Sequence, residues 1–502
     1  MFGYYRSHED YKSFVLGKLM ELSITRPEQI AENEDAILKM LIFNLDPMLP
    51  IIKPLYASTG RPAQMQMEIF RSFVLMEHMK LPLDKWADKL RHNPVLRAIA
   101  GFTLENMPSL SSYYDFINRI FPLDERPVTR YFKSKPKKKY KKGEKQPPKN
   151  KDVVAKLVNK LIPDESRFVQ RLNRRPERYL QKIFANVAVN SSITMGLIPE
   201  TVSVSGDGTC IETGASHYGK KVCNCKSKKI YKCDCARIFS DPNSTWGWDS
   251  HNERYFYGYT GYFISTYNKA EKVDLPLYLR LVQASRHDSV SAVFALAEFR
   301  QLSPNLTIDT FISDSASDNY ATYNLLNHWD INAVIALNKT ATGKSIYPTS
   351  VQLNDNGVPL CPSGLPMLYN GYCKGRSRIK WRCPRAFCKN GIQSIDACQA
   401  CSQSSYGRVI YTKPAWDARL FTRIPRGSDA WKYKMKERTA AERVNDRILI
   451  DYGVEDSMVR GKKRISFMVT LAAINIHLDA QLKVFRRRDS LCLSDFVLPY
   501  AA

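Results

Sequence analysis

The stretch TVSVSGD, at residues 201–207, alternates apolar and polar side chains and predicts a strand that ends on Asp207. A second apolar stretch, IDTFISD at 308–314, predicts a strand that ends on Asp314. Aromatic and β-branched runs around them alternate with segments of helical spacing. They predict a strand pair at 254–267, a strand at 275–285, helices at 289–302 and 319–329, and a strand at 331–338. This alternation predicts a mixed α/β fold.

The regions on either side follow other patterns. Residues 1–132 place apolar side chains three and four positions apart, as in ENEDAILKMLIFNL, and predict an all-helical N-terminal domain. Short helices of this kind suit either a DNA-binding module or a plain helical packing domain, and the pattern leaves both interpretations open. Residues 340–430 lose the strand-helix alternation and predict an inserted subdomain rich in cysteine and turn residues, after which 431–502 return to helices.

Positive charge is the strongest compositional signal. Residues 133–151, KSKPKKKYKKGEKQPPKNK, hold ten lysines and one glutamate and predict a flexible linker. The chain of 502 residues has 75 Lys and Arg against 49 Asp and Glu, a formal charge of +26. Such an excess on a folded chain predicts a polyanionic partner, and double-stranded DNA comes first. The linker lysines that we expect to contact phosphates are Lys137, Lys138, Lys139, Lys141 and Lys142.

Hydropathy and cysteine usage predict the compartment. No apolar run approaches the roughly 20 residues that cross a bilayer, so we expect a cytoplasmic protein without a membrane partner. Of the 12 cysteines, most lie in two clusters, which in a chain of this size indicates metal ligands rather than a disulfide scaffold. The first cluster predicts a zinc site at Cys223, Cys225, Cys233 and Cys235. The second predicts zinc on a subset of Cys361, Cys373, Cys383, Cys388, Cys398 and Cys401.

Acids at strand ends predict a second kind of metal site. Asp207 and Asp314 each end a predicted strand, and Glu442 lies on a later helix, four residues after Arg438 and so on the same helix face. Carboxylates are the hard oxygen ligands that Mg²⁺ prefers. Two such ions about 4 Å apart can activate a water or a 3′-hydroxyl and stabilise a leaving oxygen. In a chain with 49 acids, solvated carboxylates or helix caps remain the plain alternative.

Several motifs in order resemble a known family. They are SGDGT (205–209), DPNSTWGWDSHNERYFYGYTGYFIS (241–265), LPLYLRLVQASRHDSVSA (275–292), ISDSASDNYATYNLL (312–326) and RTAAERVNDRI (438–448). This order is similar to that of the DDE transposases of bacterial insertion sequences. Residues 58–102 also resemble the helical N-terminal domain of those enzymes, and the resemblance covers about 58–121 and 200–480. It implies an RNase H-like mixed sheet flanked by helices, formed by 152–339 and 431–502 and interrupted by the insertion 340–430.

The resemblance assigns roles to individual residues. Asp207 and Asp314 match the two aspartates of the family, and Glu442 matches the glutamate of its tyrosine-arginine-glutamate-lysine signature, with Arg438 as the arginine. The signature tyrosine and lysine positions hold Met435 and Leu449 instead. Tyr433 is the nearest tyrosine, Lys462 and Lys463 are expected to replace the lysine at phosphate, and Glu437 and Asp446 are alternatives for the third acid.

Three further groups of residues are candidates for contacts with substrate or for supporting roles. Arg443 is expected to contact phosphate, and Trp246 and Trp248 are expected to stack on an unpaired or flipped base; a solvated face and a packed loop are the alternatives. His287, Asp288 and Ser289 match a recurrent family position, where they either orient substrate or support Asp207; the alternative is a turn with a helix cap at Ser289.

The resemblance as a whole implies a transposase. Two Mg²⁺ per active site would support cleavage at the ends of an insertion sequence and transfer of the freed 3′-hydroxyl into target DNA. The implied partners are terminal inverted repeats, target DNA and a second copy of the chain in the synaptic complex, on the bacterial nucleoid. The alternatives are an RNase H-like endonuclease without strand transfer and a non-catalytic DNA-binding protein derived from a transposase.

Overall fold

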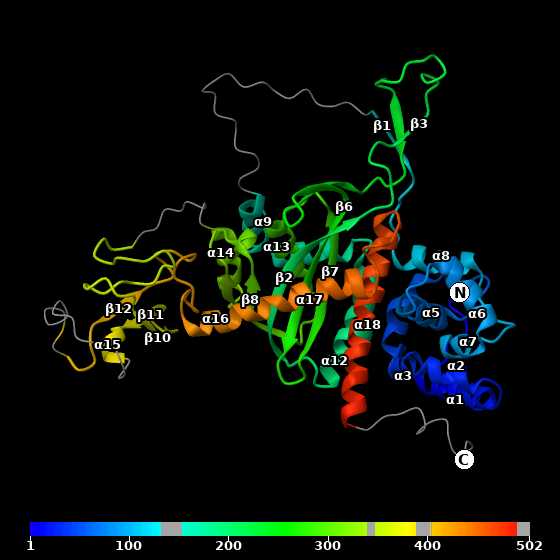
Figure 1. Ribbon diagram of the computed structural model, residues 1–502, viewed down its shortest axis with the longest axis horizontal. Helices are drawn as coiled ribbons and strands as arrows, with labels where there is room; N and C mark the ends of the chain where they lie inside the picture. The colour runs from blue at the N-terminus through cyan, green and yellow to red at the C-terminus, as the bar shows by residue number, and fades with distance from the viewer. Residues whose placement is uncertain (132–152, 339–346, 388–401, 403, 489–502) are drawn as a thin grey trace.

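The strand that contains Asp207 lies at the centre of a six-stranded mixed sheet (Figure 1). The structure is a computed structural model that describes residues 1–131, 153–338, 347–387, 402 and 404–488. The strand order is β5 (Thr245–Asp249), β6 (Arg254–Asn268), β2 (Thr201–Glu212), β8 (Thr307–Ser313), β9 (Asn332–Ile335), and β7 (Val273–Gln283) also pairs with β6. β2 runs antiparallel to β6 and parallel to β8, which is parallel to β9. The predicted mixed α/β fold is confirmed.

Two predicted strand boundaries are wrong. β2 continues past Asp207 to Glu212, because the residues after the aspartate keep pairing with β6. The aromatic run at 254–267 forms one long strand, β6, and not a strand pair. Its glycines, Gly258 and Gly261, do not turn the chain; a Cβ atom at Gly258 would clash with the Ile211 carbonyl oxygen of β2, and one at Gly261 would lie 2.6 Å from the Phe263 ring. The predicted positions of β8 and β9 and of helices α13 (Asp288–Leu302) and α14 (Tyr320–His328) are confirmed.

The N-terminal helices share one hydrophobic core with the sheet. Helix α5 (Gln66–His78) packs against α18 (Lys462–Arg488), and α18 in turn packs on β7. Phe467 of α18 joins the two parts, since its ring lies 4.8 Å from that of Phe73 and 6.3 Å from that of Phe70. Because α5 is buried from Gln66 to Glu77, it has no free face with which to read DNA.

The other N-terminal helices surround α5. They are α1 (His8–Thr25), α2 (Pro27–Glu32), α3 (Glu34–Ile42), α4 (Leu49–Ile52), α6 (Leu83–His92), α7 (Pro94–Ala100) and α8 (Leu110–Ile120). Helices α9 (Val153–Leu161) and α10 (Glu165–Asn173) pack over α13 and α14 through a small separate core. Helices α11 (Arg178–Phe184) and α12 (Asn190–Thr194) lead into β2.

Helix α18 is more apolar than expected from the sequence. By length and mean hydropathy it qualifies as a candidate membrane span, although no such run was expected. In the fold, 89% of its most apolar window is buried inside the protein. This burial is typical of the central helix of a protein core, because a helix that is apolar on all sides needs neighbours on all sides.

Two small sheets lie outside the central body. One consists of β1 (Val128–Tyr131), β4 (Ala236–Phe239) and β3 (Lys220–Lys221), in that order, and projects from the body in Figure 1. The other consists of β10 (Leu368–Cys373), β11 (Arg378–Arg382) and β12 (Val409–Thr412), lies at the opposite end of the molecule, and has its own core around Trp381 and Phe421. The helices α16 (Asp429–Met435) and α17 (Thr439–Asp446) lead the chain back to the sheet.

Candidate active site

Asp207, in the middle of β2, and Asp314, directly after β8, lie side by side on neighbouring strands. In the parallel pair β2 and β8, Ser205 stands opposite Ile312, so two residues further on Asp207 comes level with Asp314. Because strand side chains alternate, both carboxylates leave the sheet on the same face. Asp314 is fixed by capping the turn that follows β8, where its Oδ1 accepts a hydrogen bond from the Ala316 N–H at 3.0 Å. The sequence prediction that these two acids converge is therefore supported by the register.

Asp288 joins the two aspartates from the first turn of α13. A Cβ atom at Gly208 would lie 2.6 Å from Asp288 Oδ1, so the glycine leaves the space that the carboxyl group occupies beside β2. Burial and the charge of Asp314 raise the pKa of Asp288 to about 6. The sequence predicted Asp288 as part of a segment that orients substrate or supports Asp207, and not as a member of the acid cluster itself. The signal that it missed is the glycine after Asp207, which admits a third carboxyl group.

Burial and the closeness of the aspartates raise the pKa values of groups around them. Burial raises the pKa of Asp207 to about 7, with further contributions from the charges of Asp314 and Asp288. Burial and the charges of the same three aspartates also raise the pKa of Tyr262, which lies on β6 next to β2. An acid whose pKa is raised by burial and by neighbouring carboxylates, as for Asp207 and Asp288, holds a proton or a cation more tightly than an isolated carboxylate does. The cluster is therefore a candidate cation site.

Helix α17 approaches the cluster with one amide and one ion pair. Asn445 Nδ2 donates a hydrogen bond to Asp207 Oδ2 at 3.1 Å. Glu442 lies one turn before Asn445 and accepts a hydrogen bond from Arg438 Nη2 at 2.6 Å. The Glu442 side chain is 43% exposed, and the charge of Arg438 lowers the pKa of Asp207, which places the pair near the cluster but at its solvent side. The contact of Asn445 with Asp207 could not be predicted from the sequence, because a single asparagine in a helix forms no recognisable motif.

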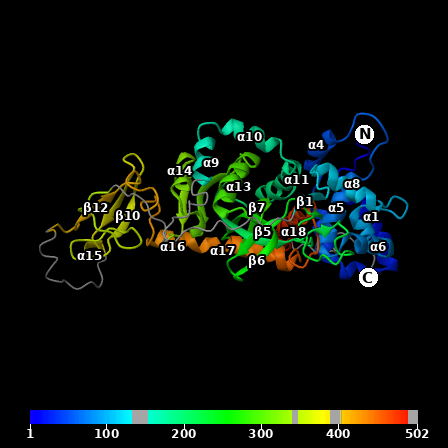
Figure 2. The same ribbon diagram turned by 90° about the horizontal axis from the view of Figure 1, so that it is seen from above.

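The two faces of β2 take different helices. Asp207 contacts α17, whereas a side chain on the next residue, Gly208, would contact the start of α13. Successive strand residues point to opposite faces, so α17 and α13 approach β2 from opposite sides. In Figure 2, α13 and α17 lie on either side of β7. The acids thus gather where β8 ends and leaves the edge of β2 uncovered. No three of Asp207, Asp288, Asp314 and Glu442 bring their carboxylate oxygens within 4.8 Å of one another, so these acids do not form a single compact ion site.

The four cysteines of the first predicted cluster do converge. Their Sγ atoms all lie within 4.8 Å of one another, with 3.6 Å between Cys223 and Cys233 and 3.6 Å between Cys225 and Cys235. Four sulfur atoms held 2.3 Å from a central zinc ion stand about 3.8 Å apart in a tetrahedron, so the geometry fits zinc. A hydrogen bond from the Cys225 backbone N–H and contacts with neighbouring thiols lower the pKa of Cys223 to about 7.

The second cysteine cluster shows no such convergence within the described part of the chain. Cys361 is buried in the small core of the β10–β12 region, whereas Cys373 is exposed and Cys383 is partly buried. Cys388, Cys398 and Cys401 lie outside the described residues, as do Lys137, Lys138, Lys139, Lys141 and Lys142.

The other predicted DNA contacts are distributed over the body. Arg443 donates two hydrogen bonds to Asp274, at 2.6 and 2.7 Å, which compensates its charge. Lys462 forms an ion pair with Glu177, and Lys463 donates to Asn118 Oδ1 at 2.8 Å. These two lysines join α18 to neighbouring segments instead of facing the acids.

The two predicted stacking residues lie on β5. Trp246 and Trp248 are 46% and 52% exposed and share the outer face of this strand. Trp248 packs at 4.8 Å against the ring of Tyr255, and Trp246 packs at 4.6 Å against His217. Their large exposed ring surface is compatible with the predicted stacking on bases.

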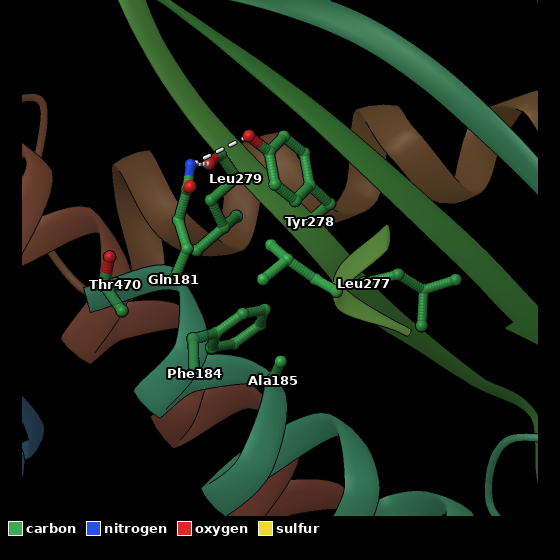
Figure 3. A pocket seen from close by; sticks show the side chains of 8 residues that line it. Gln181, Phe184, Ala185, Leu277, Tyr278, Leu279 and Thr470 are labelled. Atoms are coloured by element: carbon green, nitrogen blue, oxygen red, sulfur yellow. Dashed lines mark hydrogen bonds between the residues drawn. The ribbon is translucent and has the colours of Figure 1, made fainter. Parts of the chain in front are cut away.

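Two cavities of the core lie apart from the acid cluster. Figure 3 shows a cavity between α11, β7 and α18, where Gln181 donates to Tyr278 Oη at 2.8 Å. Its volume of about 10 Å³ admits a single water. A larger cavity of about 510 Å³ lies beside α1, α3 and α12, and neither cavity is lined by an acid of the cluster.

The raised pKa of Asp207 predicts how stability depends on pH. In the unfolded chain an aspartate has a pKa near about 3.9, so between that value and about 7 the folded state holds a proton that the unfolded state has released. The stability of the metal-free protein therefore falls as the pH rises through this window. We expect Asp207→Asn to melt at about the same temperature as the wild type at pH 4 and a few degrees higher at pH 8, measured by differential scanning calorimetry with a chelator present. A constant difference across the window would contradict this prediction.

Neither a model of a known protein family nor a curated protein matches this chain. The function is therefore argued from the geometry of the acid cluster and the distribution of charge.

Proposed function

We propose that this protein is a DDE transposase that cleaves DNA at the ends of an insertion sequence and joins the freed 3′-hydroxyl to target DNA. One observation carries the proposal. Asp207 and Asp314, which are distant in the chain, come level on neighbouring strands beside Asp288 and the Arg438–Glu442 pair. A protein that only binds DNA has no use for neighbouring buried aspartates, because DNA phosphates repel carboxylates.

The donor set fits Mg²⁺. All candidate ligands are oxygen atoms, and Asn445 Oδ1 adds a buried oxygen that has no hydrogen-bond partner among the described residues. Mg²⁺ prefers such hard ligands and keeps several waters, which suits acids that stand apart from one another. Two ions in this space would activate the attacking water or hydroxyl and stabilise the leaving oxygen. Asp207, Asp314 and Glu442 are the proposed primary ligands, and Asp288 is added to them.

Residues around the cluster would position the DNA strand. The Asp207 carboxylate is oriented by Asn445, which keeps one of its oxygens directed toward α17. Arg438 can leave Glu442 for a phosphate oxygen, since both side chains are partly exposed. In this exchange Glu442 becomes free to bind a cation at the moment when the anionic strand arrives. The proposed binding surface also includes Trp246 and Trp248.

The same proposal extends to the architecture. The central sheet, with an acid on its first strand and another after β8, supports an RNase H-like interpretation of 152–339 and 431–502. The β10–β12 region supports the interpretation of 340–430 as an insertion subdomain. We propose that the protein acts in the cytoplasm on the nucleoid, as at least a dimer when it holds two DNA ends.

An assay with labelled DNA that carries the element's own ends tests the proposal. With Mg²⁺ we expect both a cleaved strand and a longer product in which the 3′ end is joined to target DNA, resolved on a denaturing gel. A cleaved strand without the joined product would favour an endonuclease. A mobility shift without any cleavage would favour a DNA-binding protein and overturn the proposed activity.

A further inference from the structure

The β1–β4–β3 sheet and the cysteine loop form a projecting arm. We define the zinc arm as β1 together with residues 216–240, which include β3, the four cysteines and β4. Tyr131 of β1 pairs with Ala236 and Lys220 of β3 pairs with Ile238, so β4 is the central strand. Figure 1 shows this ribbon reaching away from the sheet that holds the acids.

The tip of the zinc arm has no hydrophobic core to hold it. None of residues 216–238 belongs to the core clusters of the described residues, and the strand pairing on β3 covers only Lys220 and Lys221. Between Cys223 and Cys235 the chain is held by turn hydrogen bonds and one bond from Lys221 Nζ to the Tyr231 carbonyl at 2.6 Å. A metal that ties the four sulfurs together therefore supplies most of the energy that orders the tip.

The surface of the zinc arm is densely cationic. Its exposed lysines are Lys220, Lys221, Lys226, Lys228, Lys229 and Lys232. Within the described part of the chain no ion pair joins any of these six to an acid, whereas Arg443 and Lys462 in the body are both paired. Asp234 is the only acidic residue between residues 216 and 240. A zinc ion with four thiolate ligands has a net charge of −2. The six lysines outweigh this charge and that of Asp234, so the tip stays positive.

Exposed rings and apolar side chains lie among these lysines. Tyr131 is 71% exposed, Tyr231 68%, Val222 56% and Ile230 48%. Unpaired cations that alternate with exposed rings on a narrow ribbon fit a nucleic-acid backbone better than they fit a protein surface. The lysine-rich segment 133–151 also follows β1 directly in the sequence.

We propose that the zinc arm is a metal-dependent DNA-binding element that enters a groove of the double helix and contacts the phosphates on either side. The major groove of B-DNA, about 12 Å wide, admits a two-stranded β-ribbon such as the β3–β4 pair that carries the cysteine loop, whereas the deep and narrow major groove of double-stranded RNA does not. The lysines would hold the backbone without reading sequence. The inference deepens the proposed function and rests on it only for the biological source of the DNA.

Fluorescence anisotropy of the full-length, zinc-loaded protein with a generic 30-base-pair DNA duplex, without Mg²⁺, tests the cationic surface. In the variant Lys228→Gln/Lys229→Gln we expect affinity to fall and the slope of log K against log salt to decrease in magnitude by about 1.8. The matched control is Lys156→Gln/Lys160→Gln, which removes two exposed lysines from α9 and should leave the slope within about 0.5 of the wild type. Equal slopes for the two variants would overturn the proposal.

The metal requirement has its own variant. Cys233→Ser/Cys235→Ser should lose one zinc per chain by atomic emission and bind the DNA duplex at least about tenfold more weakly. The melting temperature of its body should stay near that of the wild type, because the tip contributes nothing to the core. Wild-type affinity in the zinc-free variant would overturn the proposal, as would equally tight binding to an RNA duplex of the same sequence. These readouts need no chemistry, so failure of strand transfer and failure of the zinc arm are separate results.

Discussion

Replacing Asp207 with asparagine is expected to lower Mg²⁺-dependent cleavage by about a thousandfold or more while DNA affinity changes less than about threefold. Loss of a carboxylate ligand removes several kcal/mol of stabilisation of the charge that develops at the phosphate, and each 1.36 kcal/mol is tenfold in rate. The side chain keeps its shape and its contact with Asn445, so the fold should survive. The measurement is single-turnover cleavage of the end substrate, alongside anisotropy binding with Ca²⁺ in place of Mg²⁺.

The matched control for this prediction lies on the neighbouring strand. Asp309 is a partly buried aspartate of β8 that accepts hydrogen bonds from its neighbours Thr310 and Asn332, away from the acid cluster. Asp309→Asn should cleave within about threefold of the wild type. If both variants lose cleavage and binding to the same extent, the acid has a structural role. If Asp207→Asn cleaves normally, the active-site assignment is wrong.

Two more variants rank the remaining acids. Asp288→Asn removes a carboxyl group that lies close to β2 and shares the raised pKa values of the cluster. Glu442→Gln removes one that is half-exposed and tied to Arg438 in the free protein. We expect both variants to cleave DNA more slowly than the wild type. The variant with the smaller decrease in rate identifies the acid that contributes less to metal binding.

Patterns of alternation and spacing predicted the elements of the sheet well. β8, β9, α13 and α14 follow from apolar runs whose period matches their structure, and the two aspartates follow because parallel strands meet at one edge. The strand boundaries at Asp207 and in β6 were predicted wrongly. Glycine is common in turns, and the sequence does not tell whether Gly208, Gly258 and Gly261 turn the chain or make room for a neighbour.

The parts of the candidate site that sequence reasoning missed depend on tertiary contact. In the sequence Asp288 lies in the turn before a predicted helix, where the structure has His287 as the N-cap, and only the space over Gly208 brings the Asp288 carboxyl group to β2. Asn445 is one polar residue in a helix turn until its helix is placed on β2. The convergence of the first cysteine cluster could be predicted from the sequence, because its four cysteines are close together in the chain and their geometry depends little on the rest of the fold.

The second large effect concerns the carboxylate that holds the inserted region to the sheet. The Asp318 side chain is fully buried and accepts hydrogen bonds from Arg419 Nε at 2.8 Å, Tyr323 Oη at 2.7 Å and the Asn338 N–H at 2.7 Å. The guanidinium of Arg426 lies 3.7 Å away. The two arginines return from beyond β12, so one buried anion joins the end of the sheet to the far side of the insertion.

Asp318→Ala is expected to lower the free energy of unfolding by about 3–5 kcal/mol, because it leaves two buried guanidinium groups without their carboxylate. The measurement is the first transition in urea, followed by circular dichroism. The matched control is Asp330→Ala, which removes an exposed ion pair of the same region with Lys374 and Arg423 and should cost at most about 1 kcal/mol. Equal effects of the two variants would mean that Asp318 does not anchor the insertion. Because the turn that ends at Asp318 begins at Asp314, loss of the anchor should also weaken cleavage, and Asp318→Asn should recover part of both losses.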